Sequence, residues 1–448
     1  MSRKYFGTDG IRGTVGEEPL TAEFVLRLAS AAGRVLAPNG GTVAIGKDTR
    51  LSGYMFESAL EAGFVAVGMD VLLLGPVPTP GIAYLTRSLG ADLGVVISAS
   101  HNPYYDNGIK FFDRMGRKLS DEIEEKIEAS LLEPAITRAS ESLGRASRVD
   151  TARNQYQWFT QSTVPHDMRL EGMKIVLDCS NGAAYKVAPR VLADLGADLV
   201  PIGCSPNGKN INADCGTTHP ELLQAMVTGV DADLGIALDG DGDRLIMVDC
   251  EGNLLDGDQL LFIIANARHA AGVLTGPVVG TVMSNLGLEK ALQKRGIEFM
   301  RAQVGDRYVL ELLQQHGGIL GGETSGHIIC LDKTTTGDGL VSALQVLTVI
   351  RESGRTLAEL AVDMPKYPQT LVNVRVTAQP DLNSQSVQAS VQSVEQQLGE
   401  RGRVVLRASG TESVVRVMVE GEDAGEVETL AGQLAQAVSS AAADSAPS

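Results

Sequence analysis

The chain has 448 residues, of which 44% are hydrophobic, 21% are charged and 4% are aromatic. This length predicts about three domains or somewhat more, with enough core to fold without disulfides or metal staples. The net charge of -17 argues against nucleic acid or an anionic membrane as a partner, because both require a cationic face. A small phosphorylated substrate stays compatible, since it needs only a local group of Arg, Lys and backbone N–H donors.

The sequence predicts a cytoplasmic protein. Residues 1–9 lack the apolar core of a signal peptide, and no run of about 18 apolar residues predicts a membrane helix. The five cysteines are odd in number and form no C-x-x-C pair, so a zinc site or a disulfide framework is poorly supported. Free thiols in a reducing compartment are the expectation.

Three segments share one pattern, at residues 41–75, 174–203 and 277–305. Each has an apolar run, a helical segment, a glycine and a second apolar run. An apolar residue stands four positions before the glycine, and an acidic residue stands two positions after it. The pattern predicts a βαβ unit, and its three copies predict three similar α/β domains.

The C-terminal region has a different pattern. Strands and helices are predicted there in the order β-α-β-β-α, at residues 370–376, 384–398, 403–406, 414–419 and 426–438. This order predicts a smaller α+β domain, and we expect the Ala- and Ser-rich residues 439–448 to form a frayed tail. The four predicted domains span residues 1–150, 151–250, 251–367 and 368–448.

Carboxylates alternate with glycine directly after the predicted strand 234–238. They belong to Asp239, Asp241 and Asp243. The glycines let the backbone curl, so the carboxylate oxygens can converge on a hard cation such as Mg²⁺. An EF-hand fails, because Arg244 and Cys250 occupy its required glycine and glutamate positions. An acidic turn without metal is the alternative, although adjacent carboxylates repel one another unless a cation lies between them.

A second polar cluster, residues 97–103 (I-S-A-S-H-N-P), follows the predicted strand 93–97. A serine at the carboxyl end of a strand lies where α/β sheets present reactive groups. No G-x-S-x-G elbow surrounds it, so an α/β-hydrolase is not expected. Spacing does not choose between Ser98 and Ser100, and a polar loop that only caps the sheet is the alternative.

Two further clusters suggest ligand binding. Residues 321–327 (G-G-E-T-S-G-H) begin with two glycines and carry donors and acceptors that fit a polyhydroxy ligand, with a tight turn as the alternative. Residues 407–413 (R-A-S-G-T-E-S), followed by Arg416, combine hydroxyl and guanidinium groups that fit a phosphate. An ion pair between Arg407 and Glu412 is the alternative there. The string 41–47 is not a P-loop, because it reads as a strand and Asp48 replaces the required Ser or Thr.

Together these four clusters resemble the α-D-phosphohexomutase superfamily, over nearly the whole chain. In family terms they are the phosphoserine loop, the metal loop, the sugar loop and the phosphate-binding loop. Further strings look like those of bacterial phosphoglucosamine mutases, at residues 6–13, 281–289, 304–308 and 334–339. The resemblance implies an α/β fold with three similar mixed-sheet α/β domains and a smaller C-terminal α+β domain around a central cleft.

The resemblance also implies an isomerase activity. Such an enzyme interconverts glucosamine 6-phosphate and glucosamine 1-phosphate through a phosphoserine and a bisphosphate, for amino-sugar nucleotide and peptidoglycan precursor synthesis. The implied cofactor is Mg²⁺, with a hexose 1,6-bisphosphate as a candidate activator, and the sequence allows a homodimer. The alternatives are a phosphomannomutase or phosphoglucomutase with the same chemistry, and a catalytically silent sugar-phosphate-binding protein.

The resemblance assigns roles to individual residues. Ser100 carries the phosphoryl group and joins Asp239, Asp241 and Asp243 as a metal ligand. Lys110 is favoured over His101 as the proton carrier, and Arg12 and Arg244 neutralise charge. The implied sugar-binding residues are Glu323, Ser325 and His327, and the implied phosphate-binding residues are Arg407, Ser409, Gly410, Thr411 and Arg416. Ala408 and Ser413 stand where the family usually has proline, and Ser413 is the less usual departure.

Overall fold

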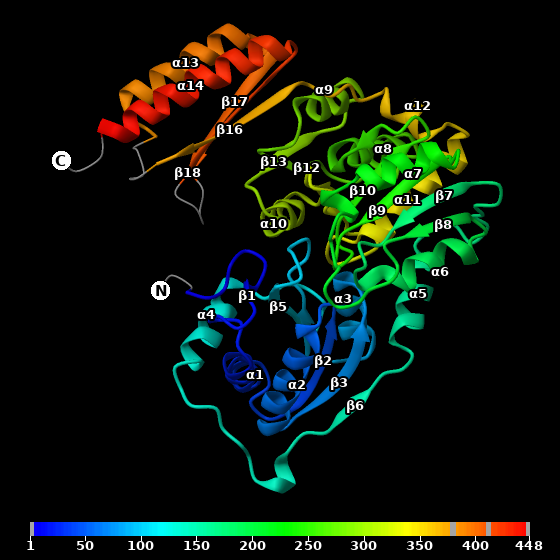
Figure 1. The fold of residues 1–448 in the computed structure, drawn as a ribbon, viewed down its shortest axis with the longest axis vertical. Coiled ribbons are helices and arrows are strands. Elements are labelled where there is room, and N and C mark those ends of the chain that lie inside the picture. The colour runs from blue at the N-terminus through cyan, green and yellow to red at the C-terminus, as the bar shows by residue number, and fades with distance from the viewer. Residues whose placement is uncertain (1–3, 377–381, 409–413, 445–448) are drawn as a thin grey trace.

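The computed structural model describes residues 4–376, 382–408 and 414–444 (Figure 1). These residues form four β-sheets, each built from its own stretch of the chain. In the described part of the chain, no helix has both the length and the apolar character needed to span a membrane.

The first sheet has six strands in the order β1-β5-β4-β2-β3-β6. They are β1 (Ile11–Thr14), β2 (Gly41–Lys47), β3 (Met69–Pro76), β4 (Leu93–Ile97), β5 (Asp106–Asp113) and β6 (Ala146–Arg148). Its helices are α1 (Ala22–Leu36), α2 (Ser52–Ala66), α3 (Thr79–Ser88) and α4 (Asp121–Ser130). Helices α1, α2 and α4 share one buried apolar cluster, whereas α3 packs in a second cluster on the other face of the sheet.

The second sheet has the strand order β11-β10-β9-β7-β8. Its strands are β7 (Lys174–Asp178), β8 (Asp198–Ile202), β9 (Leu234–Leu238), β10 (Leu245–Asp249) and β11 (Leu254–Leu255). Its helices are α5 (Ala152–Ser162), α6 (Val187–Asp194) and α7 (Glu221–Gly229). Strand β7 runs parallel to β8 and β9, and β10 runs antiparallel to β9, so the sheet is mixed.

The third sheet has the strand order β13-β12-β14-β15. Its strands are β12 (Val278–Thr281), β13 (Phe299–Ala302), β14 (Leu320–Gly322) and β15 (Ile328–Cys330). Its helices are α8 (Gly257–Ala270), α9 (Leu286–Lys294), α10 (Asp306–His316), α11 (Gly339–Ser353) and α12 (Leu357–Ala361). One continuous apolar core joins α3, α5, α8 and α11, so the first three units pack against one another.

The fourth sheet is antiparallel, with the order β16-β18-β17. Its strands are β16 (Gln369–Arg375), β17 (Gly402–Ala408) and β18 (Val414–Gly421), and its helices are α13 (Gln385–Leu398) and α14 (Ala424–Asp444). Both helices lie along one face of the sheet (Figure 1). Valine and leucine side chains from both layers form its own buried core.

The predicted α/β fold and all three βαβ repeats are confirmed. They are β2-α2-β3, β7-α6-β8 and β12-α9-β13, each with its two strands paired in parallel. The glycine before each second strand has a positive φ: 83° at Gly68, 94° at Gly196 and 71° at Gly296. This left-handed turn explains why glycine recurs there.

One expectation was wrong. The chain does not fray after Val438, because α14 continues to Asp444. Alanine has the highest helix propensity, so an Ala-rich segment that follows an amphipathic helix readily extends that helix. Residues 445–448 lie outside the described part of the chain.

Candidate active site

Ser100 lies directly after β4, at the edge of the first sheet where its parallel strands end. The residue is buried, with a left-handed φ of 53°. Its Oγ donates a hydrogen bond to Asp239 Oδ2 at 2.6 Å, and its backbone N–H donates to Ser98 Oγ at 3.0 Å. Ser98 instead donates to Asp48 Oδ2 at 2.6 Å. The structure therefore places Ser100, and not Ser98, against the carboxylate loop.

A fully buried arginine holds the Ser100 loop. The guanidinium of Arg50 donates to the carbonyl oxygens of Ser100 at 2.9 Å and Asn102 at 2.8 Å, and pairs with Asp48 at 2.7 Å. From the second unit, the Asn212 side-chain amide donates to the same two carbonyls at 2.9 Å and 3.1 Å. Carbonyls that accept two donors fix the backbone from Ser100 to Asn102, which stabilises the left-handed conformation of Ser100.

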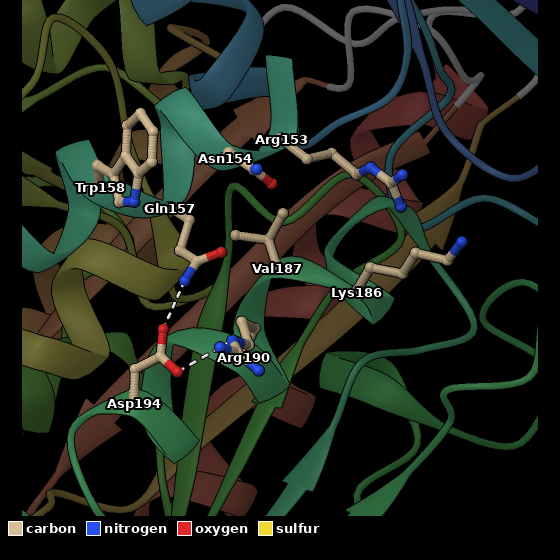
Figure 2. Close-up of a pocket in the computed structure, with 8 residues that line it drawn as sticks. All are labelled: Arg153, Asn154, Gln157, Trp158, Lys186, Val187, Arg190 and Asp194. Carbon is tan, nitrogen blue, oxygen red and sulfur yellow. Dashed lines mark hydrogen bonds and ion pairs between the residues drawn. The ribbon is translucent and has the colours of Figure 1, made fainter. Parts of the chain in front are cut away.

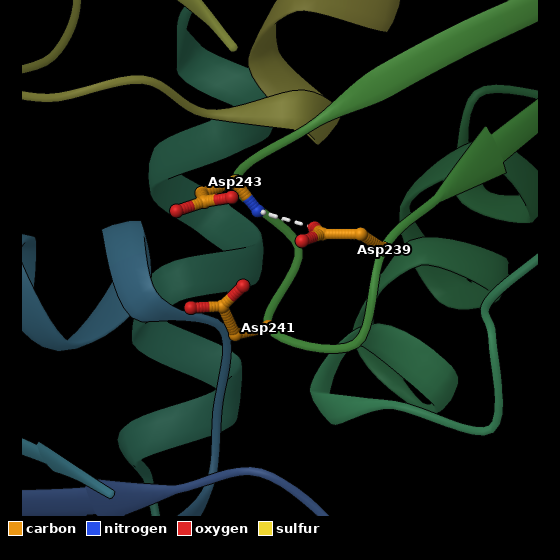
Figure 3. Close-up of side chains that lie close together, drawn as sticks. All are labelled: Asp239, Asp241 and Asp243. Atoms are coloured by element: carbon orange, nitrogen blue, oxygen red, sulfur yellow. Dashed lines mark hydrogen bonds between the residues drawn. The ribbon is translucent and has the colours of Figure 1, made fainter. Parts of the chain in front are cut away.

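The three carboxylates converge in the turn between β9 and β10. One oxygen from each of Asp239, Asp241 and Asp243 lies within 4.8 Å of the others (Figure 3). The Asp243 backbone N–H donates to Asp239 Oδ1 at 3.1 Å, which curls the turn. A Cβ on Gly240 would lie 2.6 Å from the Ser100 carbonyl oxygen, so only glycine allows this approach.

This loop fits a metal ion. All three carboxylates are buried, and Oδ1 of Asp241 and Oδ1 of Asp243 have no hydrogen-bond partner among the described residues. Burial, followed by repulsion from Asp243 and Asp241, raises the pKa of Asp239 well above its ordinary value. A cation among these oxygens would remove that repulsion and satisfy the orphaned oxygens, and carboxylate oxygens are the ligands that hard cations prefer.

Lys110 lies inside the same carboxylate cluster. Its Nζ is 2.8 Å from Asp241 Oδ2, 3.0 Å from Asp9 Oδ2 and 3.7 Å from Asp243 Oδ2. Burial alone would lower the pKa of Lys110, but Asp241, Asp9 and Asp243 raise it above its ordinary value. The side chain is therefore an ammonium in this arrangement, where it neutralises the carboxylates.

His101 differs from Lys110 in charge. Burial, followed by the positive charges of Arg244 and Arg12, lowers the pKa of His101 to about 4. Its Nδ1 is buried and has no hydrogen-bond partner in the described part of the chain. Of the two proton carriers that the sequence offers, His101 is thus the neutral one at pH 7.

Both predicted charge neutralisers lie at the carboxylates. Arg12 forms an ion pair with Asp9, which also contacts Lys110. Burial would lower the pKa of Arg244, but the charges of Asp239 and Asp243 raise it. Both guanidinium groups stay charged and lie close enough to the carboxylates to act on the same negative charge.

The predicted sugar residues have three different surroundings. Glu323 accepts a hydrogen bond from the Gly305 backbone N–H at 3.0 Å, and Ser325 is exposed. His327 lies between two carboxylates, 3.6 Å from Asp243 Oδ2 and 3.4 Å from Asp306 Oδ2. Burial would lower the pKa of His327, but Asp243 and Asp306 raise it to about 9. His327 is therefore an imidazolium that borders the carboxylate loop.

The phosphate-binding prediction is only partly within the described residues. Arg407 on β17 faces Arg416 on β18 across the antiparallel pair. Burial, together with the charge of Arg416, lowers the pKa of Arg407. Two guanidinium groups at one register position favour an anion beside them. Ser409, Gly410, Thr411 and Ser413 lie outside the part of the chain that the structure describes.

Sequence reasoning missed four residues that support this site: Asp48, Arg50, Asn212 and Lys118. Lys118 joins the first unit to the third through Asp9 at 2.5 Å and Asp306 at 2.6 Å. Asp48 and Arg50 follow β2, which is the parallel neighbour of β4. That adjacency was a usable signal for these two, because the carboxyl ends of neighbouring parallel strands meet at one edge.

A separate groove lies between α5 and α6, away from these residues (Figure 2). Its lining residues are Arg153, Asn154, Gln157, Trp158, Lys186, Val187, Arg190 and Asp194. None of the site residues predicted from the sequence lines it.

Comparison with known proteins agrees with this architecture. The models of the four phosphoglucomutase/phosphomannomutase domains match in chain order. Domains I, II and III, each described as alpha/beta/alpha, match residues 3–136, 157–252 and 256–367, and the C-terminal domain matches residues 371–437. Together these matches cover most of the chain.

Similar proteins and structures belong to the same group. The chain is 60% identical to a phosphoglucosamine mutase of Nitrosococcus oceani over 98% of both chains. It is 59% identical to one of Methylococcus capsulatus over 98% of this chain and 99% of that protein. A phosphoglucomutase/phosphomannomutase family protein from Burkholderia thailandensis is 25% identical with a TM-score of 0.82, over 98% of both chains. The chain therefore belongs to the phosphoglucomutase/phosphomannomutase family, within its group of phosphoglucosamine mutases.

Proposed function

We propose that this isomerase interconverts glucosamine 6-phosphate and glucosamine 1-phosphate through a phosphorylated Ser100. The observation that carries the proposal is the Ser100 hydroxyl, which is buried and hydrogen-bonded to Asp239 within a cluster of three carboxylates. The name of the relatives that are 57–60% identical supports the amino sugar as the substrate. The product would feed amino-sugar nucleotide and peptidoglycan precursor synthesis in the cytoplasm.

The chemistry requires a stored phosphoryl group, because O6 and O1 of a hexose are too far apart for direct transfer. A hydroxyl of the sugar monophosphate attacks the phosphorus on Ser100, a new P–O bond forms and the bond to Ser100 Oγ breaks. The resulting bisphosphate reorients. Ser100 Oγ then takes the other phosphoryl group, and the sugar oxygen that leaves regains a proton.

The residues around Ser100 act through charge and position. Mg²⁺ held by Asp239, Asp241, Asp243 and Ser100 would supply positive charge to the transferring phosphoryl group. Arg12 and Arg244 add charge to the same region. Neutral His101 is the candidate to accept the proton of the attacking hydroxyl, and the Lys110 ammonium is the candidate to return a proton to the leaving sugar oxygen.

The sugar hydroxyls and the phosphate that is not transferred require a binding site of their own. We assign the sugar hydroxyls to Glu323, Ser325 and His327. We assign the non-transferring phosphate to Arg407, Ser409, Gly410, Thr411 and Arg416. A hexose 1,6-bisphosphate is proposed as the activator that first phosphorylates Ser100, and a homodimer as the assembly.

A structure of an Aspergillus fumigatus N-acetylphosphoglucosamine mutase in complex with GlcNAc-6P and magnesium shares the fold at 18% identity and a TM-score of 0.69, covering 98% of this chain and 96% of that chain.

Substrate preference is tested by phosphorus NMR with Mg²⁺, a trace of glucose 1,6-bisphosphate and one hexose 6-phosphate at a time. The anomeric phosphate signal should grow roughly tenfold or more faster from glucosamine 6-phosphate than from the glucose or mannose ester, because a site that pairs with the amino group rejects analogues that lack it. Faster conversion of glucose or mannose 6-phosphate would instead make the protein a phosphoglucomutase or phosphomannomutase, which the description of the family models also covers.

Metal binding is tested by thermal unfolding of metal-free protein as Mg²⁺ is added. Tm should rise with Mg²⁺, because a ligand that binds only the folded state stabilises it by about 2.7 kcal/mol at a hundred times its Kd. The shift should disappear in Asp241→Asn and persist in Asp249→Asn, which changes a buried carboxylate at the far end of β10. Equal shifts in both variants, or with NaCl at matched ionic strength, would show that Mg²⁺ acts elsewhere.

A further inference from the structure

Residues 282–286 connect β12 to the first residue of α9, and they hold the C-terminal unit on the third unit. We call them the hinge segment. Arg403 on β17 donates to the Ser284 carbonyl oxygen at 2.6 Å. Glu420 on β18 accepts from the Leu286 backbone N–H at 2.9 Å and pairs with Arg403 at 2.7 Å. The strands that carry the two phosphate-side arginines are therefore seated on this segment by a largely buried ion pair.

The hinge segment also holds the linker that enters the C-terminal unit. The Asn285 side chain donates to the Tyr367 carbonyl oxygen and accepts from the Tyr367 N–H, both at 3.0 Å. Lys366 forms an ion pair with Asp256 at 2.5 Å. A Cβ on Gly287 would lie 2.1 Å from the Pro365 carbonyl oxygen, so the linker packs directly on the start of α9.

One carboxylate oxygen connects this segment to the sugar loop. Asp258, in the first turn of α8, has no exposed surface. Its Oδ2 accepts from the Asn285 backbone N–H at 2.8 Å and from Thr324 Oγ1 at 2.7 Å. The Gly257 N–H donates to the Thr324 carbonyl oxygen at 3.1 Å, which fixes the loop on the same helix end. Asp258 takes no part in the chemistry described above.

We propose that Asp258 is a positioning residue that couples the sugar loop to the hinge segment and through it to the C-terminal unit. The inference rests on the proposed function, since a bisphosphate that reorients must be gripped at the sugar and at the far phosphate together. A loop and a domain that share one buried acceptor change position together, because neither can shift without breaking a bond to it.

The test compares four single variants, and a double variant that combines Asp258→Leu with Thr324→Val, with the wild-type enzyme. Asp258→Leu removes the shared acceptor at similar size, and Asp258→Asn keeps a side-chain oxygen that can accept both bonds. Thr324→Val leaves Asp258 in place and removes the hydroxyl that donates to it at 2.7 Å, together with the longer 3.5 Å contact of that hydroxyl with the Met283 carbonyl oxygen. Asp249→Leu is the matched control, because Asp249 is also a buried acceptor but lies at the end of β10, where it accepts from backbone N–H groups of the following turn.

The first readout is affinity for glucose 1,6-bisphosphate, measured by calorimetry with Mg²⁺ in a Ser100→Ala background so that no phosphoryl transfer occurs. Kd should rise roughly tenfold in Asp258→Leu and in Thr324→Val, within the range of measured coupling effects. The double variant should bind like Asp258→Leu alone, since both changes break one connection. Asp258→Asn and Asp249→Leu should bind like the wild type.

The second readout is turnover of glucosamine 6-phosphate with an intact Ser100, with and without added glucose 1,6-bisphosphate. An uncoupled enzyme should lose the bisphosphate before it reorients. Asp258→Leu should therefore stall without the additive and recover with it, which a generally misfolded variant would not do. If Thr324→Val binds the bisphosphate like the wild type, the proposal is overturned even if Asp258→Leu fails to fold. Additive effects of the two changes on Kd would also overturn it. Failure of the wild type to convert glucosamine 6-phosphate would contradict the proposed function alone, because the binding cycle needs no turnover.

Discussion

Ser100→Ala is expected to lower kcat for the hexosamine phosphate by roughly 10⁴-fold or more, because a methyl group cannot carry a phosphoryl group between the two sugar oxygens. The variant should fold, since the change removes one hydrogen bond, to Asp239, and leaves the Arg50 and Asn212 bonds to the loop backbone in place. Coupled assays measure kcat. Mass spectrometry of the intact protein after incubation with glucose 1,6-bisphosphate measures whether a phosphoryl group is bound to it.

Ser98→Ala is the matched control for this prediction. Its hydroxyl donates to Asp48 and accepts from the Ser100 backbone N–H, and it makes no bond to the metal loop. Its loss should therefore cost about 1–3 kcal/mol of stability while phosphate still accumulates on Ser100. Phosphate on Ser98, or turnover close to the wild-type rate in Ser100→Ala, would exclude the mechanism proposed here.

Arg50→Met should destabilise the protein by about 3–5 kcal/mol, the usual result of breaking a buried ion pair from one side. The substitution leaves Asp48 buried without its cation, and it leaves the carbonyls of Ser100 and Asn102 with one donor fewer. Arg50→Lys should recover little, because an ammonium cannot reproduce the planar fork of donors. Denaturant unfolding gives the free energies.

The Arg50→Met deficit should also depend on pH. Burial already raises the pKa of Asp48 above its unfolded value, and the loss of Arg50 would raise it further. A folded-state pKa above the unfolded value makes stability fall as pH rises above about 4, the ordinary pKa of Asp, so the deficit should be larger at pH 7 than at pH 4. Arg190→Met, at an exposed arginine paired with Asp194, should change stability by less than about 0.5 kcal/mol. If Arg50→Met also lowered the free energy of unfolding by less than about 0.5 kcal/mol, the supporting role of Arg50 would be refuted.

Local sequence patterns were sufficient for the fold and for the centre of the site. Apolar runs and recurring glycines located the βαβ units, and the alternation of Asp and Gly after 234–238 located the carboxylate turn. These features depend on neighbours within a few residues, so a single sequence carries them. The choice between Ser98 and Ser100 depends instead on which hydroxyl bonds Asp239, 139 residues later in the chain, which spacing does not encode and for which only the resemblance indicates Ser100.

Asn212 and Asp258 could not be predicted in this way, because their partners are distant in the chain. Asn212 meets a loop 112 residues earlier, and Asp258 meets Thr324 66 residues later. The resemblance assigns His327 to the sugar. The structure shows its contacts with Asp243 and Asp306, which belong to other elements.

Strand β6 has a consequence for dividing the chain into fragments. The segment after α4 returns to the first sheet, where Ala146–Arg148 pairs in parallel with β3, flanked by backbone hydrogen bonds from Val71 to Arg145 and from Val149 to Leu73. A fragment that stopped at residue 136, where the match to the domain I family model ends, would lack this strand. It would bare the hydrogen-bonding edge of β3, and open edges of this kind recruit other chains. Both fragments expose the apolar α3 face that packs on the other units, so a fragment that includes residue 149 should aggregate more slowly than the shorter one at the same concentration.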